Sequence, residues 1–240
     1  MGYTNAGANV QLAFWLHLGT ASAVIVYYRE KFRLLFDFSR PESKWLWKFL
    51  FLTTLGTLIV ALPIRLFLIE LIPSSLGPFL NLIVALFLVI TGLLLSKWDH
   101  LMDLSLLTVE DLPDKKYFIA GLFQGVAAIP GISRSGITVS YFLYEKLGGE
   151  EAFKGSFWMS VPASLGAVSL EIIIALSKHE SILPGGEVLG VFVGVLLAFV
   201  VGFFTLGALI KIARKYSFSK ICYLLAFIIV LGVFIEVSFG

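Results

Sequence analysis

The sequence predicts an all-α, polytopic membrane protein with six transmembrane helices and one re-entrant helix hairpin, arranged as part of an inverted repeat. Its 240 residues are 58% hydrophobic and 14% charged, with a mean hydropathy of +0.94, whereas a soluble domain carries about a quarter charged residues. Several apolar stretches approach the length of about 20 residues that a helix needs to cross a bilayer. We therefore treat residues 1–240 as a single integral membrane domain, with spans expected at 10–28, 46–70, 78–96, 155–177, 187–210 and 218–237.

Between the third and fourth expected spans lie two shorter apolar pieces, at 117–129 and 135–147, which a Pro-Gly-Ile-Ser-Arg-Ser-Gly run separates. Each piece is too short to cross a bilayer alone. The pair fits a re-entrant hairpin over 117–147 that enters and leaves on one side of the membrane. The alternative is one kinked spanning helix.

Charge favours the hairpin and sets the orientation. Lysines and arginines gather in the segments 29–48 and 211–220, while the loops at 71–77 and 178–186 offer only Lys178. The positive-inside rule makes the two basic segments cytoplasmic, and a hairpin that does not cross then puts both termini outside a cell membrane. A kinked spanning helix would place 211–220 outside, against the rule. The net charge of +2 predicts no nucleic-acid partner.

The chain divides into a first half of three spans, 10–96, and a second half, 117–237, made of the hairpin plus three spans. Two units with an odd number of spans would be inverted relative to each other, and inverted repeats place a substrate site near the midplane between broken helices. By this symmetry we expect a second hairpin before the first half, where the sequence shows none.

The run Pro130–Gly136 contains charged and hydroxyl side chains that an apolar membrane segment does not need, so it is the candidate for a chemical function. Arg134 lies between serines at the expected start of a helix, a pattern that suits a phosphate group, and its planar guanidinium stays charged at physiological pH. The alternative is an arginine that extends to the interface and binds lipid headgroups. We take Arg134 and Ser133 as the catalytic candidates.

Neighbours of Arg134 are candidates for substrate binding. Ser133 and Ser135 either cap the following helix or donate to a phosphate, and Gly131 and Gly136 let backbone N–H groups approach an anion closely. Thr138 lies one helical turn after Arg134, where its hydroxyl faces the same side or bonds its own backbone.

Two further polar residues lie in apolar surroundings. Gln124 needs hydrogen-bond partners, so it either lines the cavity as a substrate-binding residue or binds the backbone of the hairpin. Glu171 lies inside the fourth expected span, where a carboxylate is a functional candidate. No P-loop, dinucleotide fingerprint or pair of carboxylates with metal-ligand spacing accompanies them, so no metal ligand can be named.

The run 121–138, Gly-Leu-Phe-Gln-Gly-Val-Ala-Ala-Ile-Pro-Gly-Ile-Ser-Arg-Ser-Gly-Ile-Thr, resembles the second signature of the undecaprenyl-diphosphate phosphatase family, of the bacitracin-resistance type. The stretches 16–20 and 156–163, followed by Gly166, are similar to the family's first full span and to the span after its hairpin. The resemblance covers essentially the whole chain.

The resemblance implies a hydrolase that converts polyisoprenyl diphosphate to the monophosphate and so recycles the lipid carrier of cell-wall synthesis, giving bacitracin resistance. It also implies an inverted repeat with two hairpins, a site that opens outward, and a divalent cation, Mg²⁺ or Ca²⁺. Arg134 would grip the diphosphate, with Ser133 and Thr138 nearby. The family's first signature, with its glutamates and histidine, has no match before His17. We expect either a start upstream of Met1 or a divergent member.

Two other functions stay open at this point. A polyprenyl-phosphate flippase or anion transporter without hydrolysis also suits an inverted repeat around an anion site. A non-catalytic subunit would use the Ser-Arg-Ser run as a lipid-headgroup anchor. The partners are the polyisoprenyl diphosphate lipid and the membrane, and a homodimer is left open.

Overall fold

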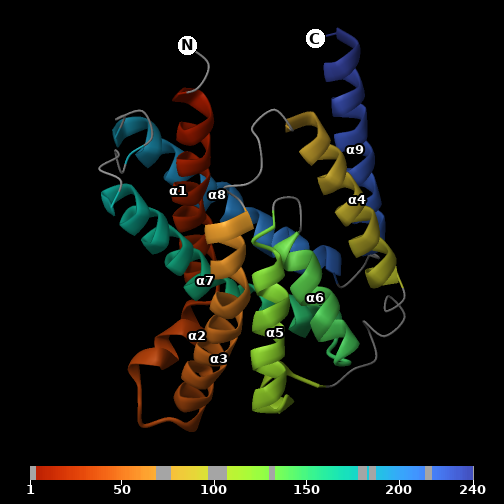
Figure 1. The fold of residues 1–240 in the computed structure, drawn as a ribbon. Coiled ribbons are helices and arrows are strands. Elements are labelled where there is room, and N and C mark those ends of the chain that lie inside the picture. The colour runs from red at the N-terminus through yellow and green to blue at the C-terminus, as the bar shows by residue number, and fades with distance from the viewer. Residues whose placement is uncertain are drawn as a thin grey trace. The chain divides into compact units, whose positions relative to one another are not determined.

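The computed structural model describes residues 4–68, 77–96, 107–129, 133–177, 183, 188–213 and 218–239, and this part of the chain is helical without a strand. The all-α prediction is confirmed for these residues (Figure 1). The elements in chain order are α1 (Thr4–Tyr27), α2 (Arg29–Arg33), η1 (Leu34–Phe36), α3 (Pro41–Pro63), η2 (Ile64–Leu68), α4 (Gly77–Ser96), η6 (Val109–Asp111), α5 (Asp114–Val126), α6 (Arg134–Tyr144), α7 (Gly149–Ser177), α8 (Val188–Ala213) and α9 (Phe218–Phe239).

A long helix occupies each of the six segments expected to span. By length and composition, three helices in the described part of the chain can cross a membrane, namely Pro41–Leu66, Gly149–Ser177 and Val188–Lys211. The chain is therefore a multi-pass membrane protein, and the full count of six spans stays a prediction. Pro63 ends α3 because it lacks an N–H for the helical ladder, and one π-helical turn, η2, follows it.

The chain forms two compact units, Met1–Trp47 with Trp158–Leu209, and Lys48–Phe157 with Ile210–Gly240. Each unit draws on both of the halves expected from the sequence, so the division at 10–96 and 117–237 stays a prediction.

In the first unit, α1 and α8 pack closely through small residues. A Cβ added at Gly19 would overlap the carbonyl oxygen of Val195 and lie 2.8 Å from the Cβ of Ala198. Beside the end of α1, Lys31 places its Nζ 4.6 Å from the ring centroid of Trp45 and 5.1 Å from that of Trp158. These cation–π contacts fix the short helix α2 against the start of α3.

In the second unit, α4 runs along α9, and α5 lies beside α6 (Figure 1). Lys116, near the start of α5, pairs with Glu145, which caps the end of α6, at 2.7 Å between Nζ and Oε1. The start of α5 and the end of α6 are therefore close together, so the chain reverses direction between the two short helices. Re-entry of this hairpin into the membrane stays a prediction.

Candidate functional site at the turn of the helical hairpin

The turn between α5 and α6 ends in a capped helix that begins at Arg134. Ser133 has extended backbone angles, φ −68° and ψ 111°, and its Oγ accepts a hydrogen bond from the N–H of Gly136 at 3.2 Å. This is an N-cap, one of the two roles expected for the serine. The cap uses a lone pair of Oγ and leaves the hydroxyl proton for another acceptor, so capping and donation to a phosphate are compatible.

Arg134 lies in the first turn of α6, and its side chain is half-buried, like those of Ser133 and Ser135. The first N–H groups of a helix precede its first internal hydrogen bond and point along the axis toward the turn. Together with the helix dipole, they favour an anion at this position. Positive charge and oriented N–H groups therefore coincide at one end of α6.

Gly136 serves a packing role. A Cβ at this position would lie 2.6 Å from Cγ2 of Thr91 on α4 and 3.1 Å from the side chain of Ser133. Only a residue without a side chain lets α4 contact the first turn of α6 and leaves room for the cap. The approach of its N–H to an anion stays a prediction.

The Thr138 side chain is fully buried. Its Oγ1 lies 2.9 Å from the carbonyl oxygen of Arg134 and 2.6 Å from Oγ of Ser156 on α7. Of the two alternatives for this hydroxyl, the bond to its own backbone is the one that the structure shows. Direct contact of Thr138 with substrate stays a prediction.

Gln124 is 3% exposed, and its Nε2 donates to Oγ1 of Thr57 at 2.9 Å. Thr57 in turn donates to the carbonyl oxygens of Thr53, at 2.8 Å, and Gly121, at 3.2 Å. The amide therefore links α5 to α3. The two roles expected from the sequence were lining the cavity and binding the hairpin backbone, and neither of them involves α3. Its role in substrate binding stays a prediction.

The base of the hairpin is tied by side chains from both arms. Besides the Lys116–Glu145 pair, the Tyr141 hydroxyl donates to the carbonyl oxygen of Lys116 at 3.1 Å. The rings of Phe123 and Tyr141 stack with centroids 5.0 Å apart. These contacts set the spacing of the two arms at the base of the hairpin.

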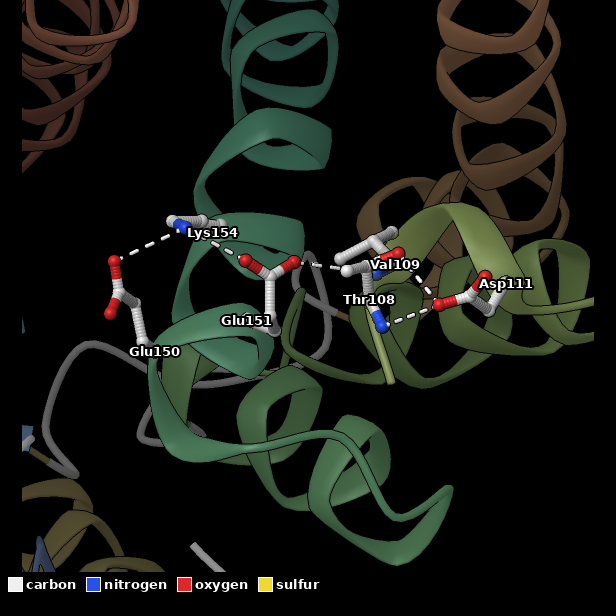
Figure 2. A network of polar contacts seen from close by, with 6 residues as sticks. All are labelled: Thr108, Val109, Asp111, Glu150, Glu151 and Lys154. Carbon is white, nitrogen blue, oxygen red and sulfur yellow. Dashed lines mark hydrogen bonds and ion pairs between the residues drawn. The ribbon is translucent and has the colours of Figure 1, made fainter. Parts of the chain in front are cut away.

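A polar network joins the segments that flank the hairpin (Figure 2). Before the hairpin, the backbone N–H and the hydroxyl of Thr108 both donate to Oδ2 of Asp111 at 2.8 Å. These bonds hold the pKa of Asp111 below its ordinary value of 3.8, since they favour the ionised carboxyl.

After the hairpin, Glu151 in the first turn of α7 accepts a hydrogen bond from the N–H of Val109 at 3.4 Å. Lys154 bonds the other oxygen of Glu151 at 2.7 Å and an oxygen of Glu150 at 3.1 Å (Figure 2). The segment before α5 and the start of α7 are thereby held together, which closes the hairpin at its base.

Two further residues expected at the site are Gly131 and Glu171. Gly131, with Pro130 and Ile132, lies outside the described residues. Glu171 lies in the part of α7 that belongs to the other compact unit, and its role stays a prediction.

Within the described ranges, no group of three or more His, Cys, Asp or Glu side chains could hold a metal ion. The described residues therefore name no ligand for a divalent cation, and we derive no step through one.

Sequence reasoning missed Ser156 and Thr57, which bind the two arms of the hairpin from other helices. Ser156 lies within the stretch 156–163 that supports the resemblance. A hydroxyl in such an apolar helix is a sign of a buried polar group, and this sign could have identified it. Its partner, 18 residues away, could not be identified without the fold.

Comparison with known proteins identifies the family of this chain. The family model described as "Bacitracin resistance protein BacA" matches residues 1–234. An undecaprenyl-diphosphatase of Methanococcoides burtonii is 35% identical over 238 residues, which cover 94% of this chain and 84% of that protein. One of Saccharolobus solfataricus is 33% identical over 244 residues, covering 96% and 82%, and one of Methanopyrus kandleri is 34% identical over 219 residues, covering 90% and 78%. The chain belongs to the bacitracin resistance protein BacA family.

Proposed function

We propose that this chain hydrolyses undecaprenyl diphosphate to the monophosphate in the cell membrane. The observation that carries the proposal is the capped turn at Arg134, which suits a phosphate group and lies within a chain of the BacA family. Relatives covering most of this chain are named undecaprenyl-diphosphatase.

In this reaction water adds to the terminal phosphorus, and the bond from that phosphorus to the bridging oxygen breaks. Inorganic phosphate and undecaprenyl monophosphate leave, and the protons of the water pass to the phosphate groups and solvent. Charge on the transferring phosphoryl group is met by the Arg134 guanidinium, the first N–H groups of α6 and the Ser133 hydroxyl. Positioning and electrostatic stabilisation of this kind supply most of the catalysis in phosphoryl transfer.

The membrane arrangement is part of the proposal. Six helices span, the α5–α6 hairpin is re-entrant, and both termini lie outside, which keeps the basic segments 29–48 and 211–220 cytoplasmic. The support is the reversal of the chain between α5 and α6, because a hairpin that does not cross leaves an even number of spans. Labelling of single cysteines placed in 29–48 and in 211–220 should require a permeant reagent.

A divalent cation belongs to the proposal only through the family resemblance. Removal of Mg²⁺ and Ca²⁺ with EDTA should lower phosphate release, and their return should restore it. Release that is unchanged in EDTA would remove the cation from the proposal and leave the rest intact.

The test is phosphate release from undecaprenyl diphosphate by the purified chain in detergent, beside the Methanococcoides burtonii relative. Arg134→Ala should lower release by about 100-fold or more, and Arg134→Lys should recover part of the loss, since a lysine keeps the charge without the planar fork. The matched control is Arg40→Ala, which removes an exposed arginine that pairs with Asp37 at 2.8 Å.

Equal release by the Arg134→Ala variant and the wild type would overturn the assignment of Arg134. A chain that moves labelled lipid across liposomes without releasing phosphate, while the relative hydrolyses it, would overturn the proposed function.

A further inference from the structure

Two buried hydroxyls connect the helix that carries Arg134 to α7. Thr138 on α6 is 0% exposed and Ser156 on α7 is 2% exposed, and their oxygens lie 2.6 Å apart. This distance lies within the usual range of a hydrogen bond between hydroxyls. It is a fixed link between two helices, at the turn of α6 that follows Arg134.

The link continues into α6 through the Thr138 hydroxyl. Its Oγ1 lies within hydrogen-bond distance of the carbonyl oxygens of Arg134, at 2.9 Å, and Ser135, at 3.4 Å, which can only accept. Between Thr138 and Ser156 either hydroxyl can donate. The chain of hydrogen bonds runs from α7 to the carbonyl oxygen of Arg134 itself.

The packing around the link leaves it little freedom. A Cβ at Gly155, next to Ser156, would lie 3.0 Å from the ring of Phe142 on α6 and 3.0 Å from Cγ2 of Val109. The helices α6 and α7 are thus in close contact at this level. A carbonyl held by such a link fixes the rotation of the first turn of α6, and with it the point from which the guanidinium extends.

We propose that Ser156 is a positioning residue for the reaction, which acts through Thr138 to hold the first turn of α6 so that Arg134 meets the diphosphate. The kinetic part of this inference rests on the proposed function. It also assigns the Thr138 hydroxyl to orientation of α6, in place of contact with substrate.

The kinetic test compares kcat and KM for undecaprenyl diphosphate in a small set of variants. Ser156→Ala and Thr138→Val should each lower kcat about tenfold with KM changed less than threefold. The double variant should lose about tenfold as well, because both changes break one chain of hydrogen bonds. Thr138→Ser, which keeps the hydroxyl, should recover most of the loss seen in Thr138→Val.

The matched control is Ser140→Ala. Ser140 is also a buried hydroxyl on α6, two residues after Thr138, and it donates to the Gly136 carbonyl oxygen of the same helix at 2.7 Å. Its removal should leave kcat within about twofold. Losses that multiply to about a hundredfold in the Ser156→Ala/Thr138→Val double variant, or a raised KM in Thr138→Val alone, would overturn the inference in favour of direct contact between Thr138 and substrate.

Amide hydrogen exchange tests the same link without any activity. Exchange in the segment 133–141 should quicken about tenfold in Ser156→Ala and stay unchanged in Ser140→Ala. Equal exchange in the two variants would overturn the inference even if the protein hydrolyses its substrate. A wild-type protein without phosphatase activity would instead reject the proposed function, and the exchange result would still decide the link.

Discussion

Replacement of Gly121 by alanine should separate α3 from α5 and loosen the whole hairpin. An added Cβ would overlap the carbonyl oxygen of Thr53, and it would lie 2.9 Å from the carbonyl carbon of Thr53 and 3.0 Å from Cα of Gly56. All of these atoms belong to the backbone of α3, so no side chain can move aside. The two helices have to part by a few tenths of an ångström or more.

The change in the free energy of unfolding caused by Gly121→Ala follows from the contacts that this shift disturbs. Overpacking against backbone costs about 3 kcal/mol at the upper end of its range. The buried bond from Gln124 to Thr57 lengthens with the same shift, at about 1 kcal/mol. Alanine regains about 1 kcal/mol as the better helix former. The free energy of unfolding should therefore fall by about 3 kcal/mol.

The matched control is Gly166→Ala. A Cβ at Gly166 on α7 meets nothing within 4 Å, so the same substitution should stabilise the protein by up to about 1 kcal/mol. The measurement is loss of helical circular dichroism as SDS is titrated into detergent micelles. If Gly121→Ala unfolds at the same SDS fraction as Gly166→Ala, the close approach of α3 and α5 is wrong.

Three further predictions concern the ends of the hairpin. Lys146 has φ of +68°, in the left-handed region that favours glycine, so Lys146→Gly should raise the free energy of unfolding by about 1 kcal/mol; a lower value in SDS titration would contradict this. Glu145→Ala should lower the free energy of unfolding by about 1 kcal/mol, because Glu145 is mostly buried beside Lys116. The exchange of charges in Lys116→Glu/Glu145→Lys should restore part of this free energy. A double variant no more stable than Glu145→Ala would argue against the pair. Because the pKa of Asp111 is lowered in the folded protein, its contribution to stability is present above pH 3.8 and disappears as the pH falls through the lower folded value. The protection of the Thr108 amide against hydrogen exchange, corrected for its intrinsic exchange rate, should fall over this pH range in the wild type. In Asp111→Asn it should stay constant.

The helices were largely predictable from the sequence because apolar length and turn residues are local signals. The arms expected at 117–129 and 135–147 appear as α5 (Asp114–Val126) and α6 (Arg134–Tyr144), and the N-cap at Ser133 follows from its residue type and position. The start of α5 lies earlier than expected, since a hydropathy pattern does not count the charged first turn of a helix.

The partners of the polar residues were not predictable in the same way. Gln124 was expected to need hydrogen bonds, but its partner Thr57 lies 67 residues away, and nothing local in one sequence marks such a pair. Anion binding by Gly136 stays a prediction, and the structure adds a packing role, because its missing side chain admits Thr91 of α4. Residue type thus indicates that a group needs a partner or space, while the partner itself depends on the fold.

The pattern of these contacts explains how a short hairpin can hold an arginine in place. Short helices of 11 and 13 residues have little stability of their own, so their geometry must come from their neighbours. The supports occur at three levels: the Lys116–Glu145 pair at the base, the Gln124–Thr57 bond along α5, and the Ser156–Thr138 link one turn after Arg134 on α6. None of these bonds uses the guanidinium of Arg134. Under the proposed function, a site arranged in this way would be organised before the substrate arrives, so that little binding energy would be lost in ordering it. A fixed positive charge is most effective in catalysis under that condition.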